Sequence, residues 1–547
     1  MLFRVKWASL ALILSAVLFQ SASGQVSFIK GEGAPAVATT EVSQVLEKGA
    51  KLELERRWGE ALTLYEDALR RFPSERNLER GFQFSRMHYD LGRRYRDSSF
   101  SERLVALPER DALALYTEVL LMIQSHHVDS PNWRAVVDHG TSGFEVSLAD
   151  PVFIERHLGG VPADRVDLLR RDIRARLAAM PISTRLEARD AVAMAARLAT
   201  QHAGVPSTPV VLEYLCGAAN SLDEYSNFLT ADQLDETYAQ IEGNFVGLGV
   251  ELKVDAGSLV IMRVIPNSPA ERGGMLPLDQ IVAVGGRATS ELDTERAADM
   301  LQGAEGTWVD VTVVSPGQPA RVLRIRREQV EVPSVDDVKL IDPQFGIGYF
   351  KLTCFQKTTV KDLDAALWKL HREGMRSLVM DLRGNPGGLL TSSVEVADRF
   401  IEEGTIVSTR GRNTGEDFNY SAQKAGTWKV PLVVLIDGDS ASASEIFAGA
   451  IRDHHRGEIV GTRSYGKGSV QGIFTLNAAR SGIRLTTAKF FSPAGRPYSR
   501  VGVEPHVVVR QAAKPANGQL APNTTDAASD AFVDAALQIA RRQLARR

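Results

Sequence analysis

Apolar residues recur with a helical period through the first 240 residues of the chain. Segments such as "RDALALYTEVLLMIQSHHV" and "RLEARDAVAMAARLATQHAG" place apolar side chains three and four positions apart, which is the spacing of one helix face. The segment "WGEALTLYEDALRRFP" does the same and ends at Pro73, where a helix stops. We therefore expect a helical segment over residues 42–100 and an α-rich domain over residues 101–240.

Two consecutive helices are expected over residues 42–75. Five of their positions have the spacing of a tetratricopeptide repeat, which this stretch resembles: Gly49, Ala61, Tyr65, Ala68 and Pro73. The residues that follow match that pattern poorly, and such repeats need neighbours to bury their faces. A plain helical hairpin and a TPR-like module that binds a protein partner are both open.

At Gly243 the period changes to that of short strands. The strand segments are "FVGLGVELKV", "SLVIMRVI", "DQIVAVGG", "WVDVTVVSP" and "RVLRIRREQV", and "SPAERGGM" and "ELDTERAADMLQG" are expected to be helices. This pattern predicts a small β-rich domain over residues 241–330. The ordered set of the Gly-Leu-Gly-Val loop, "VIPNSPAERGGM" and "DQIVAVGG" resembles a PDZ domain.

The PDZ resemblance implies a peptide-binding loop and strand that start at Gly247, Leu248, Gly249 and Val250. In that family an extended peptide adds as a strand, and loop amides hold its C-terminal carboxylate. Glycines let these N–H groups approach an anion without obstruction by a Cβ. One departure is that "PLDQIVAV" stands where the family often has a Gly-Asp turn, and we expect it to affect the turn more than the groove.

From Phe345 onward, near-continuous apolar strands alternate with amphipathic helices. The strands are "FGIGYFKL", "RSLVMDLRG" and "VPLVVLIDG". Their pattern predicts a buried, largely parallel sheet of α/β type over residues 335–510. Ligands tend to bind beyond the carboxyl ends of such strands, where "DLRGNPGG" and "DGDSASASE" lie.

The two ends of the chain differ in composition from the predicted domains between them. Residues 1–24 combine Arg4 and Lys6 with an apolar run and small residues, which is the layout of a secretory signal peptide. We expect an exported, periplasmic protein that is held at a membrane only if this signal is not cleaved. Residues 511–547 begin as a flexible linker and end in a basic helix.

Charge and composition narrow the classes of partner. The net charge is −3 with 24% charged residues, so we expect no nucleic-acid partner. Cys216 and Cys354 have no metal-ligand spacing, and we expect two buried free thiols, no metal site and no cofactor. His126 and His127 are adjacent and point in different helical directions, so we interpret them as surface histidines.

Three serines stand at alternate positions in "GDSASASEIFAG", where a strand turns into a helix. This is the geometry of a nucleophile elbow, which places a hydroxyl near a helix N-terminus and near backbone N–H groups. The nearby histidines, His454 and His455, fall at the far end of the same helix, about 18 Å away. Lysine is the other base used with serine, and Lys467 is a good candidate between two glycines.

Four ordered motifs carry a second resemblance. They are "DLRGNPGG", "DGDSASASEIFAGAIRDH", "GTRSYGKGSVQ" and "TTAKFFSPAGRPYSRVGVEPH", and together they resemble the carboxyl-terminal processing peptidases, also called tail-specific proteases. With "LDEYSNFL" and the PDZ-like domain, the resemblance covers about residues 112–509. The segments before it, a long helical insert and the C-terminal tail lie outside it.

The resemblance implies a role for each matched residue. Ser442 would be the nucleophile, Lys467 the general base, and Gln471 the residue that helps to orient the lysine. The N–H of Ala443, with an amide of Gly387 or Gly388, would form the oxyanion hole.

The remaining polar residues of these motifs are interpreted as structural. Asp453 matches an acidic position of the family. Ser440 is expected to close the turn, and Ser444 to open the helix. His506 stands where the family's closing motif has an acid, outside the predicted pair.

The implied protein is a serine endopeptidase that recognises protein C-terminal tails through its PDZ domain and cleaves peptide bonds through an acyl-enzyme, without a cofactor. Two alternative hypotheses are a catalytically silent scaffold with PDZ and TPR-like modules, and a Ser-His hydrolase. Intact Ser442, Lys467 and Gln471 argue against the scaffold. The placement of the histidines argues against the Ser-His hydrolase.

Overall fold

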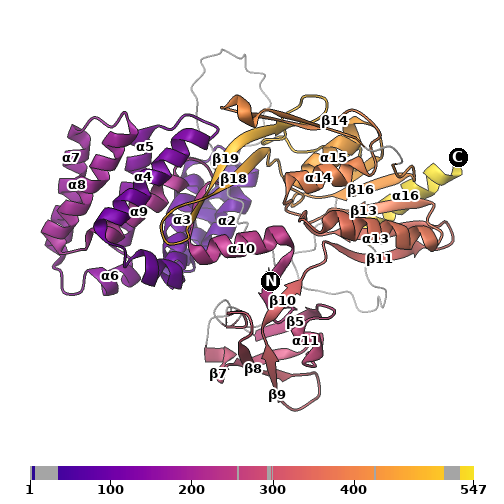
Figure 1. Ribbon diagram of the computed structural model, residues 1–547, viewed down its shortest axis with the longest axis horizontal. Helices are drawn as coiled ribbons and strands as arrows, with labels where there is room; N and C mark the ends of the chain where they lie inside the picture. The colour runs from indigo at the N-terminus through magenta and orange to yellow at the C-terminus, as the bar shows by residue number, and fades with distance from the viewer. Residues whose placement is uncertain are drawn as a thin grey trace. The chain divides into compact units, whose positions relative to one another are not determined.

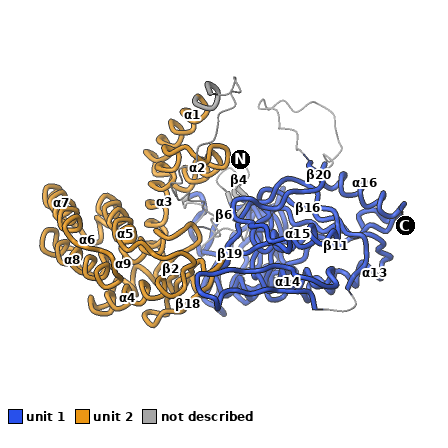
Figure 2. The backbone as a smooth tube through the Cα atoms, turned by 90° about the horizontal axis from the view of Figure 1, so that it is seen from above, with its two compact units in different colours: residues 1–12, 235–470, 489–547 blue, residues 13–234, 471–488 orange. Residues whose placement is uncertain are grey.

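The computed structural model describes residues 3–5, 35–255, 258–291, 297, 300–423, 427–509 and 530–546. Most of the predicted signal peptide, most of the predicted helix in "ELDTERAADMLQG" and the predicted linker after residue 510 lie outside these residues. The chain forms two compact units (Figure 2). One unit contains residues 1–12, 235–470 and 489–547, and the other contains residues 13–234 and 471–488.

The second of these units is mainly helical, as the indigo to magenta part of Figure 1 shows. Its helices are α1 (Pro35–Leu54), α2 (Trp58–Arg71), α3 (Arg76–Arg96), α4 (Glu109–His126), α5 (Trp133–Ser147), α6 (Pro151–His157), α7 (Ala163–Ala179), α8 (Arg185–Ala203) and α9 (Ser207–Asn220), with a π-helical turn at Ser99–Leu104. One apolar cluster joins α1, α2 and α3, and a larger one joins α3 to α9. The expected helical N-terminal region is therefore confirmed.

Tyr65 fixes the packing of the first three helices. Its side chain is 2% exposed. A Cβ added to Gly49 of α1 would lie 2.2 Å from the Tyr65 hydroxyl oxygen, and one added to Gly81 of α3 would lie 2.5 Å from the ring. The ring therefore occupies space that only glycine leaves free on both neighbouring helices.

The β-rich domain is one antiparallel sheet with the strand order β1-β4-β5-β6-β8-β9, and β7 pairs with β6. Its elements are β1 (Phe3–Val5), β4 (Val250–Asp255), β5 (Ser258–Val264), α11 (Pro269–Arg272), β6 (Gln280–Val284), β7 (Arg287–Ala288), a 3-10 turn (Thr289–Glu291), β8 (Trp308–Val314) and β9 (Arg321–Arg326). Inward-facing residues such as Ile261, Ile281 and Val311 are fully buried. Alternation of apolar and polar positions along β8 produces this one-sided core.

The chain enters and leaves the β-rich domain through a two-stranded antiparallel ribbon. β3 (Asn244–Gly247) leads in and β10 (Glu328–Glu331) leads out, paired from Gly247 with Glu328 to Asn244 with Glu331. Just beyond the ribbon, Val332 donates its backbone N–H to the carbonyl of Gly243 at 2.9 Å. The two ends of the domain are therefore adjacent.

The remaining core is a six-stranded sheet with the order β11-β12-β13-β16-β17-β20, parallel except for β11. Its elements are β11 (Val335–Asp342), β12 (Ile347–Leu352), α13 (Thr359–Arg372), β13 (Ser377–Asp381), α14 (Leu390–Asp398), β16 (Leu432–Ile436), α15 (Ala443–Asp453), β17 (Glu458–Gly461), β20 (Val507–Val508) and α16 (Ala531–Ala545). All five residues of β16 are buried, as expected for a strand covered on both faces.

Helices cover both faces of this sheet (Figure 1). Leu378 and Met380 of β13 pack with the layer of α13, α14 and α15, whereas Val379 packs with α16 on the opposite face. The expected α/β core is confirmed. The C-terminal helix, which the sequence placed after a linker, completes its second layer.

Further strands extend beyond this sheet. β14 (Thr405–Gly411) pairs antiparallel with β15 (Phe418–Ser421), and β18 (Ser469–Thr475) pairs with β19 (Gly482–Phe491). β19 also pairs with β2 (Asn227–Leu229), which precedes α10 (Ala231–Glu242). Among the described residues, no helix combines the length and the apolar character that a bilayer crossing requires.

Candidate active site

Ser442 is the last residue of the turn that joins β16 to α15 at the carboxyl edge of the parallel sheet. It is the N-cap of α15, with φ 55° and ψ −113°. L-residues rarely adopt a positive φ, and such strain is concentrated at functional sites, including the nucleophile elbow. Ser440 and Ser444 are not among the described non-glycine residues with positive φ, so the backbone sets Ser442 apart from them.

Ser440 and Ser444 are fully buried and hold the turn together. The Ser440 hydroxyl donates to the Leu382 carbonyl at 2.9 Å. The Ser444 hydroxyl donates to the Asn385 carbonyl at 3.0 Å. The expectation that Ser444 opens the helix is wrong, because the N-cap is Ser442 and Ser444 ties α15 to the loop of residues 382–388.

The glycines of that loop lie directly against Ser442. A Cβ added to Gly387 would lie 2.8 Å from the Ser442 Cβ and 2.9 Å from the Ala443 nitrogen. One added to Gly388 would lie 1.9 Å from the Phe355 carbonyl oxygen. Both glycines have positive φ, 101° and 139°. Only glycine therefore fits this approach of loop to elbow.

Three backbone amides were predicted as oxyanion donors, and their surroundings differ. The N–H of Gly387 donates to the Asn385 side-chain oxygen at 2.9 Å. Within the part of the chain that the structure describes, the N–H groups of Gly388 and Ala443 have no such acceptor. Gly388 and Ala443 are therefore better placed than Gly387 to donate to a bound oxyanion.

Glu445 connects the serine turn to the lysine turn, and the sequence analysis missed it. Its carboxylate accepts the backbone N–H groups of Ser442 at 2.8 Å, Lys467 at 2.9 Å and Gly466 at 2.6 Å, and the Ser464 hydroxyl at 2.6 Å. Burial raises the pKa of Glu445, and these four hydrogen bonds oppose the rise. A serine N-cap followed three residues later by Glu is a capping-box signature, which could have indicated the first of these bonds.

Lys467 lies in the turn between β17 and β18 and is half-buried. A Cβ added to its neighbour Gly468 would lie 2.1 Å from the Ser499 nitrogen, so the turn packs tightly against the chain at that residue. The N–H of Tyr465 donates to the Ser440 carbonyl at 3.0 Å, which is a further link between the two turns. The predicted orienting residue, Gln471, lies in β18.

The histidines of the Ser-His alternative lie at the other end of α15. His454 is the C-cap residue, and its Nε2 lies 2.7 Å from the Thr405 carbonyl oxygen. His455 is exposed. Asp453 accepts the Ala494 N–H at 3.1 Å and forms an ion pair with Arg496. These contacts hold the C-terminal end of the helix in place.

His127 is buried at the end of α4, with 3% of its surface exposed. Its Nε2 lies 2.9 Å from the Asp223 carboxylate, and its Nδ1 lies 2.9 Å from the Asp129 carbonyl. The interpretation as a surface residue is wrong for His127, because "LDEYSNFL" folds over it. The thiol expectation also needs correction: Cys216 is buried, but Cys354 is only half-buried.

The conformation of the predicted peptide-binding loop, Gly247–Val250, depends on Gly249. Gly249 has φ 88°, and a Cβ there would lie 2.2 Å from the Ser268 Cβ. Leu248 and Val250 are buried, and the Leu248 carbonyl accepts the Ala270 N–H at 2.7 Å. Gly247 pairs with Glu328 at the end of the β3–β10 ribbon. The loop therefore lies against the first turn of α11.

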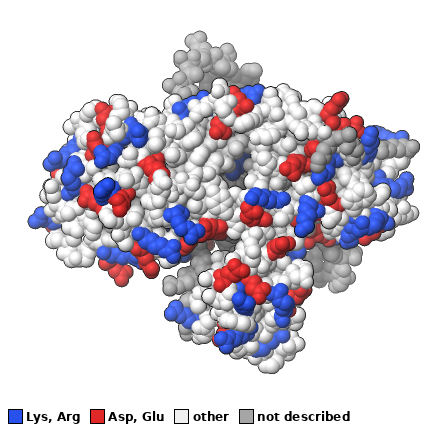
Figure 3. All heavy atoms as spheres, in the orientation of Figure 1, with Lys and Arg blue, Asp and Glu red and all other residues white. Residues whose placement is uncertain are grey.

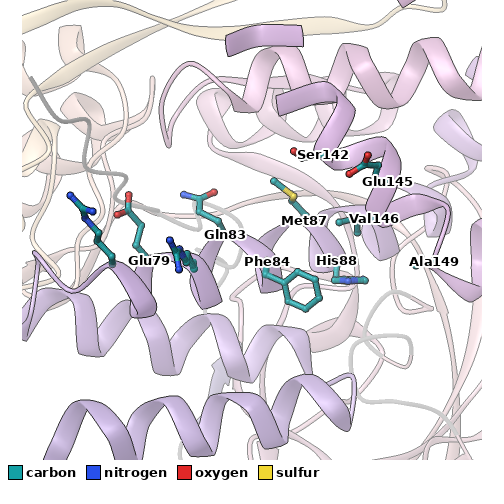
Figure 4. A pocket seen from close by; sticks show the side chains of 11 residues that line it. Glu79, Gln83, Phe84, Met87, His88, Ser142, Glu145, Val146 and Ala149 are labelled. Carbon is teal, nitrogen blue, oxygen red and sulfur yellow. The ribbon is translucent and has the colours of Figure 1, made fainter. Parts of the chain in front are cut away.

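A separate cavity of about 820 Å³ opens between α3 and α5 in the helical unit (Figure 4). Its lining combines apolar side chains, including Phe84, Met87 and Val146, with charged ones such as Glu79 and Glu145. On the face drawn in Figure 3, acidic and basic side chains are interspersed over the described residues, without an extended basic patch. The described residues contain no cluster of three or more His, Cys, Asp or Glu side chains that could hold a metal ion.

Comparison with known proteins identifies relatives of the α/β core and of the β-rich domain. A profile of peptidase family S41 matches residues 346–509, and a PDZ domain profile matches residues 260–315. The carboxy-terminal-processing protease of Bartonella bacilliformis is 35% identical over 322 residues, which are 58% of this chain and 73% of the relative. The carboxyl-terminal-processing protease of Synechocystis sp. is 33% identical over 53% of this chain and 69% of the relative.

Among solved structures, the chain is similar to the photosystem II D1 C-terminal processing protease. The two are 26% identical, with a TM-score of 0.38, over 73% of this chain and 93% of that one.

Proposed function

The chain belongs to peptidase family S41, the family of the carboxyl-terminal processing proteases, and we propose that it cleaves proteins through Ser442 as nucleophile and Lys467 as general base. The observation that carries this proposal is that one buried carboxylate, that of Glu445, accepts the backbone N–H groups of both residues. A pair that must exchange a proton requires fixed relative positions, and this link supplies them.

The reaction is acyl transfer. The Ser442 oxygen attacks the peptide carbonyl while the neutral Lys467 amine takes its proton and returns it to the leaving amine. Ala443 and Gly388 N–H groups stabilise the oxyanion, and water then hydrolyses the acyl-enzyme. Gln471 helps to orient the lysine.

The PDZ domain selects the substrate. The three-residue strand β1 pairs antiparallel with β4 at the end of the sheet, and this pairing supports the proposal that β4 accepts an extended strand. A protein C-terminal tail adds here, with its carboxylate at the Gly247–Val250 loop. The tail then delivers the upstream chain to Ser442.

The protein acts after export, and its TPR-like helices over residues 42–75 take a protein partner. The layout of residues 1–24 supports export, and the repeat-like spacing of Gly49, Ala61, Tyr65, Ala68 and Pro73 supports the partner. N-terminal sequencing of the chain recovered from periplasm tests the first point, since an intact Met1 there contradicts cleavage after Gly24.

Cleavage of an unfolded protein with an apolar C-terminal tail tests the catalytic assignment. Ser442→Ala and Lys467→Ala should each lower the rate by at least about 10³-fold. His454→Ala is the control, and it should retain the wild-type rate. Wild-type cleavage in either variant of the pair contradicts the proposal, and loss of cleavage in His454→Ala with an intact fold favours the Ser-His hydrolase.

A further inference from the structure

Helix α16 reaches the loop that lies against Ser442, although 20 residues outside the described part of the chain, 510–529, separate it from β20. Asp530, the N-cap of α16, accepts a hydrogen bond from the Arg383 guanidinium at 2.9 Å. The same guanidinium lies over the Phe532 ring at 5.1 Å from its centroid. Arg383 is the second residue of the loop formed by residues 382–388.

Arg383 is also held by a residue of the parallel sheet, Asp381 of β13. Its Nε and Nη2 donate to the two oxygens of Asp381 at 2.9 and 2.6 Å. Asp381 is 1% exposed, and it also accepts the Tyr349 hydroxyl at 2.9 Å. Tyr349 and Phe532 belong to the apolar cluster under α16. Arg383 therefore sits between a buried carboxylate of β13 and the first turn of α16, and each side restrains it.

The loop beyond Arg383 transmits this restraint to the elbow. The Gly384 N–H donates to Asp437 at 2.9 Å, and the Ala441 N–H donates to the Asn385 carbonyl at 3.0 Å. Pro386 follows Asn385 and leads to Gly387 and Gly388, and Gly387 packs against Ser442. A shift at Arg383 would therefore move the amides expected to bind the oxyanion.

We propose that α16 is a positioning element of the catalytic site, which acts through Asp530, Phe532 and Arg383 on the loop that carries Gly387 and Gly388. This inference rests on the proposed function for the role of that loop. Asp530 and Phe532 do not touch substrate; they hold Arg383. Because a displacement of about 1 Å can cost on the order of 10²-fold in rate, a partial loosening should lower kcat rather than raise KM.

The far end of α16 provides a matched control. Arg541 donates to Asp342 at 2.8 Å and lies over the Phe345 ring at 5.3 Å. This anchor has the same chemistry as the Asp530 end, an arginine held by a carboxylate and an aromatic ring. It holds the same helix, but Asp342 is the last residue of β11 and lies outside the 382–388 loop. Arg541→Gln should therefore weaken the docking of α16 without releasing Arg383.

The test compares Asp530→Asn, Phe532→Leu and Arg541→Gln in the full chain. Asparagine still caps a helix, so Asp530→Asn removes mainly the charge that faces Arg383. Below the unfolding temperature of all variants, Asp530→Asn and Phe532→Leu should lower kcat about 5- to 20-fold with KM within about twofold. Arg541→Gln should keep kcat within about twofold at a similar loss of Tm. Wild-type kcat in the first two variants, or an equal kcat loss in the third, overturns the proposal.

Hydrogen–deuterium exchange separates this proposal from the catalytic assignment. In a Ser442→Ala background, Asp530→Asn should speed exchange in the 382–390 segment, whereas Arg541→Gln should not. Unchanged exchange in Asp530→Asn overturns the positioning role even if Ser442 is confirmed as the nucleophile. If the wild type shows no Ser442-dependent cleavage, the proposed function fails, and the exchange result still decides whether α16 restrains the loop.

Discussion

Glu445 accepts the backbone N–H of Lys467 at 2.9 Å, across 22 residues of sequence. The same oxygen, Oε2, accepts the N–H of Ser442 at 2.8 Å, so one atom relates the two proposed catalytic residues. The turn between β16 and α15 and the turn between β17 and β18 are thereby held at a fixed separation. The carboxylate holds the two residues through their backbone N–H groups.

Glu445→Gln should impair catalysis more than folding. The amide offers one acceptor oxygen in place of two, and its NH₂ would face N–H donors. Buried donors left without an acceptor cost about 1–3 kcal/mol each. We expect kcat to fall on the order of 10²-fold, measured with a quenched peptide substrate. Glu395→Gln, on an exposed position of α14, is the control. A kcat of Glu445→Gln near that of the control contradicts the positioning role.

Gly387→Ala should disturb the oxyanion loop. The new Cβ would approach the Ser442 Cβ to 2.8 Å, so the loop must move away from the elbow. Loss of oxyanion donors lowers kcat by about 10²–10³-fold. The control is Gly438→Ala, because a Cβ there meets no atom within 4 Å. Equal activity of the two variants would show that the loop does not contribute to catalysis.

His127→Gln should change the dependence of stability on pH. Burial disfavours the charged ring, but hydrogen bonds to Asp223 and Asp129 outweigh it and raise the pKa of His127 above 6.5. The folded state therefore binds this proton more tightly than the unfolded state. The stabilisation is complete below about pH 6.5 and is lost as the pH rises through the folded-state pKa.

The difference in Tm between wild type and His127→Gln should therefore be larger at pH 6 than at pH 9, as measured by circular dichroism. His126→Gln is the control, since His126 stacks on Phe474 at 4.2 Å and is only half-buried. A Tm difference that does not change with pH would mean that His127 is neutral in the folded protein.

Gly249→Ala should weaken the binding of C-terminal peptides. The substitution forces a Cβ against Ser268 in a backbone with φ 88°. We expect about a tenfold loss of affinity, or about 1.4 kcal/mol, in fluorescence anisotropy with the Ser442→Ala chain. Gly286→Ala has comparable backbone strain, with φ 79°, but open space around its Cβ. If both variants bind equally well, the Gly247–Val250 loop is not the peptide site.

Periodicity was sufficient to predict the fold class. The five apolar residues of β16 indicated burial on both faces, and the alternation along β8 indicated a sheet covered on one. The place of α16 could not be predicted, because a helix after a linker carries no signal for the surface that it covers. Its amphipathic pattern is equally consistent with a partner or with the chain's own sheet.

Long-range polar contacts limited the prediction of the site. Motif resemblance singled out Ser442 among three serines, and the positive φ of that residue is visible only in the structure. The Arg383–Asp530 contact spans 147 residues and follows no local pattern. His127 appeared exposed in sequence because its partner, Asp223, lies 96 residues away.

The β3–β10 ribbon has a consequence for the evolution and engineering of the chain. Because Val332 and Gly243 are hydrogen-bonded neighbours, residues 244–331 could be cut out and their ends joined by a short turn without redirecting the backbone on either side. The domain is in effect a cassette. A different peptide-recognition domain whose own termini are close together could be inserted at the same point, which would give the peptidase a new substrate range.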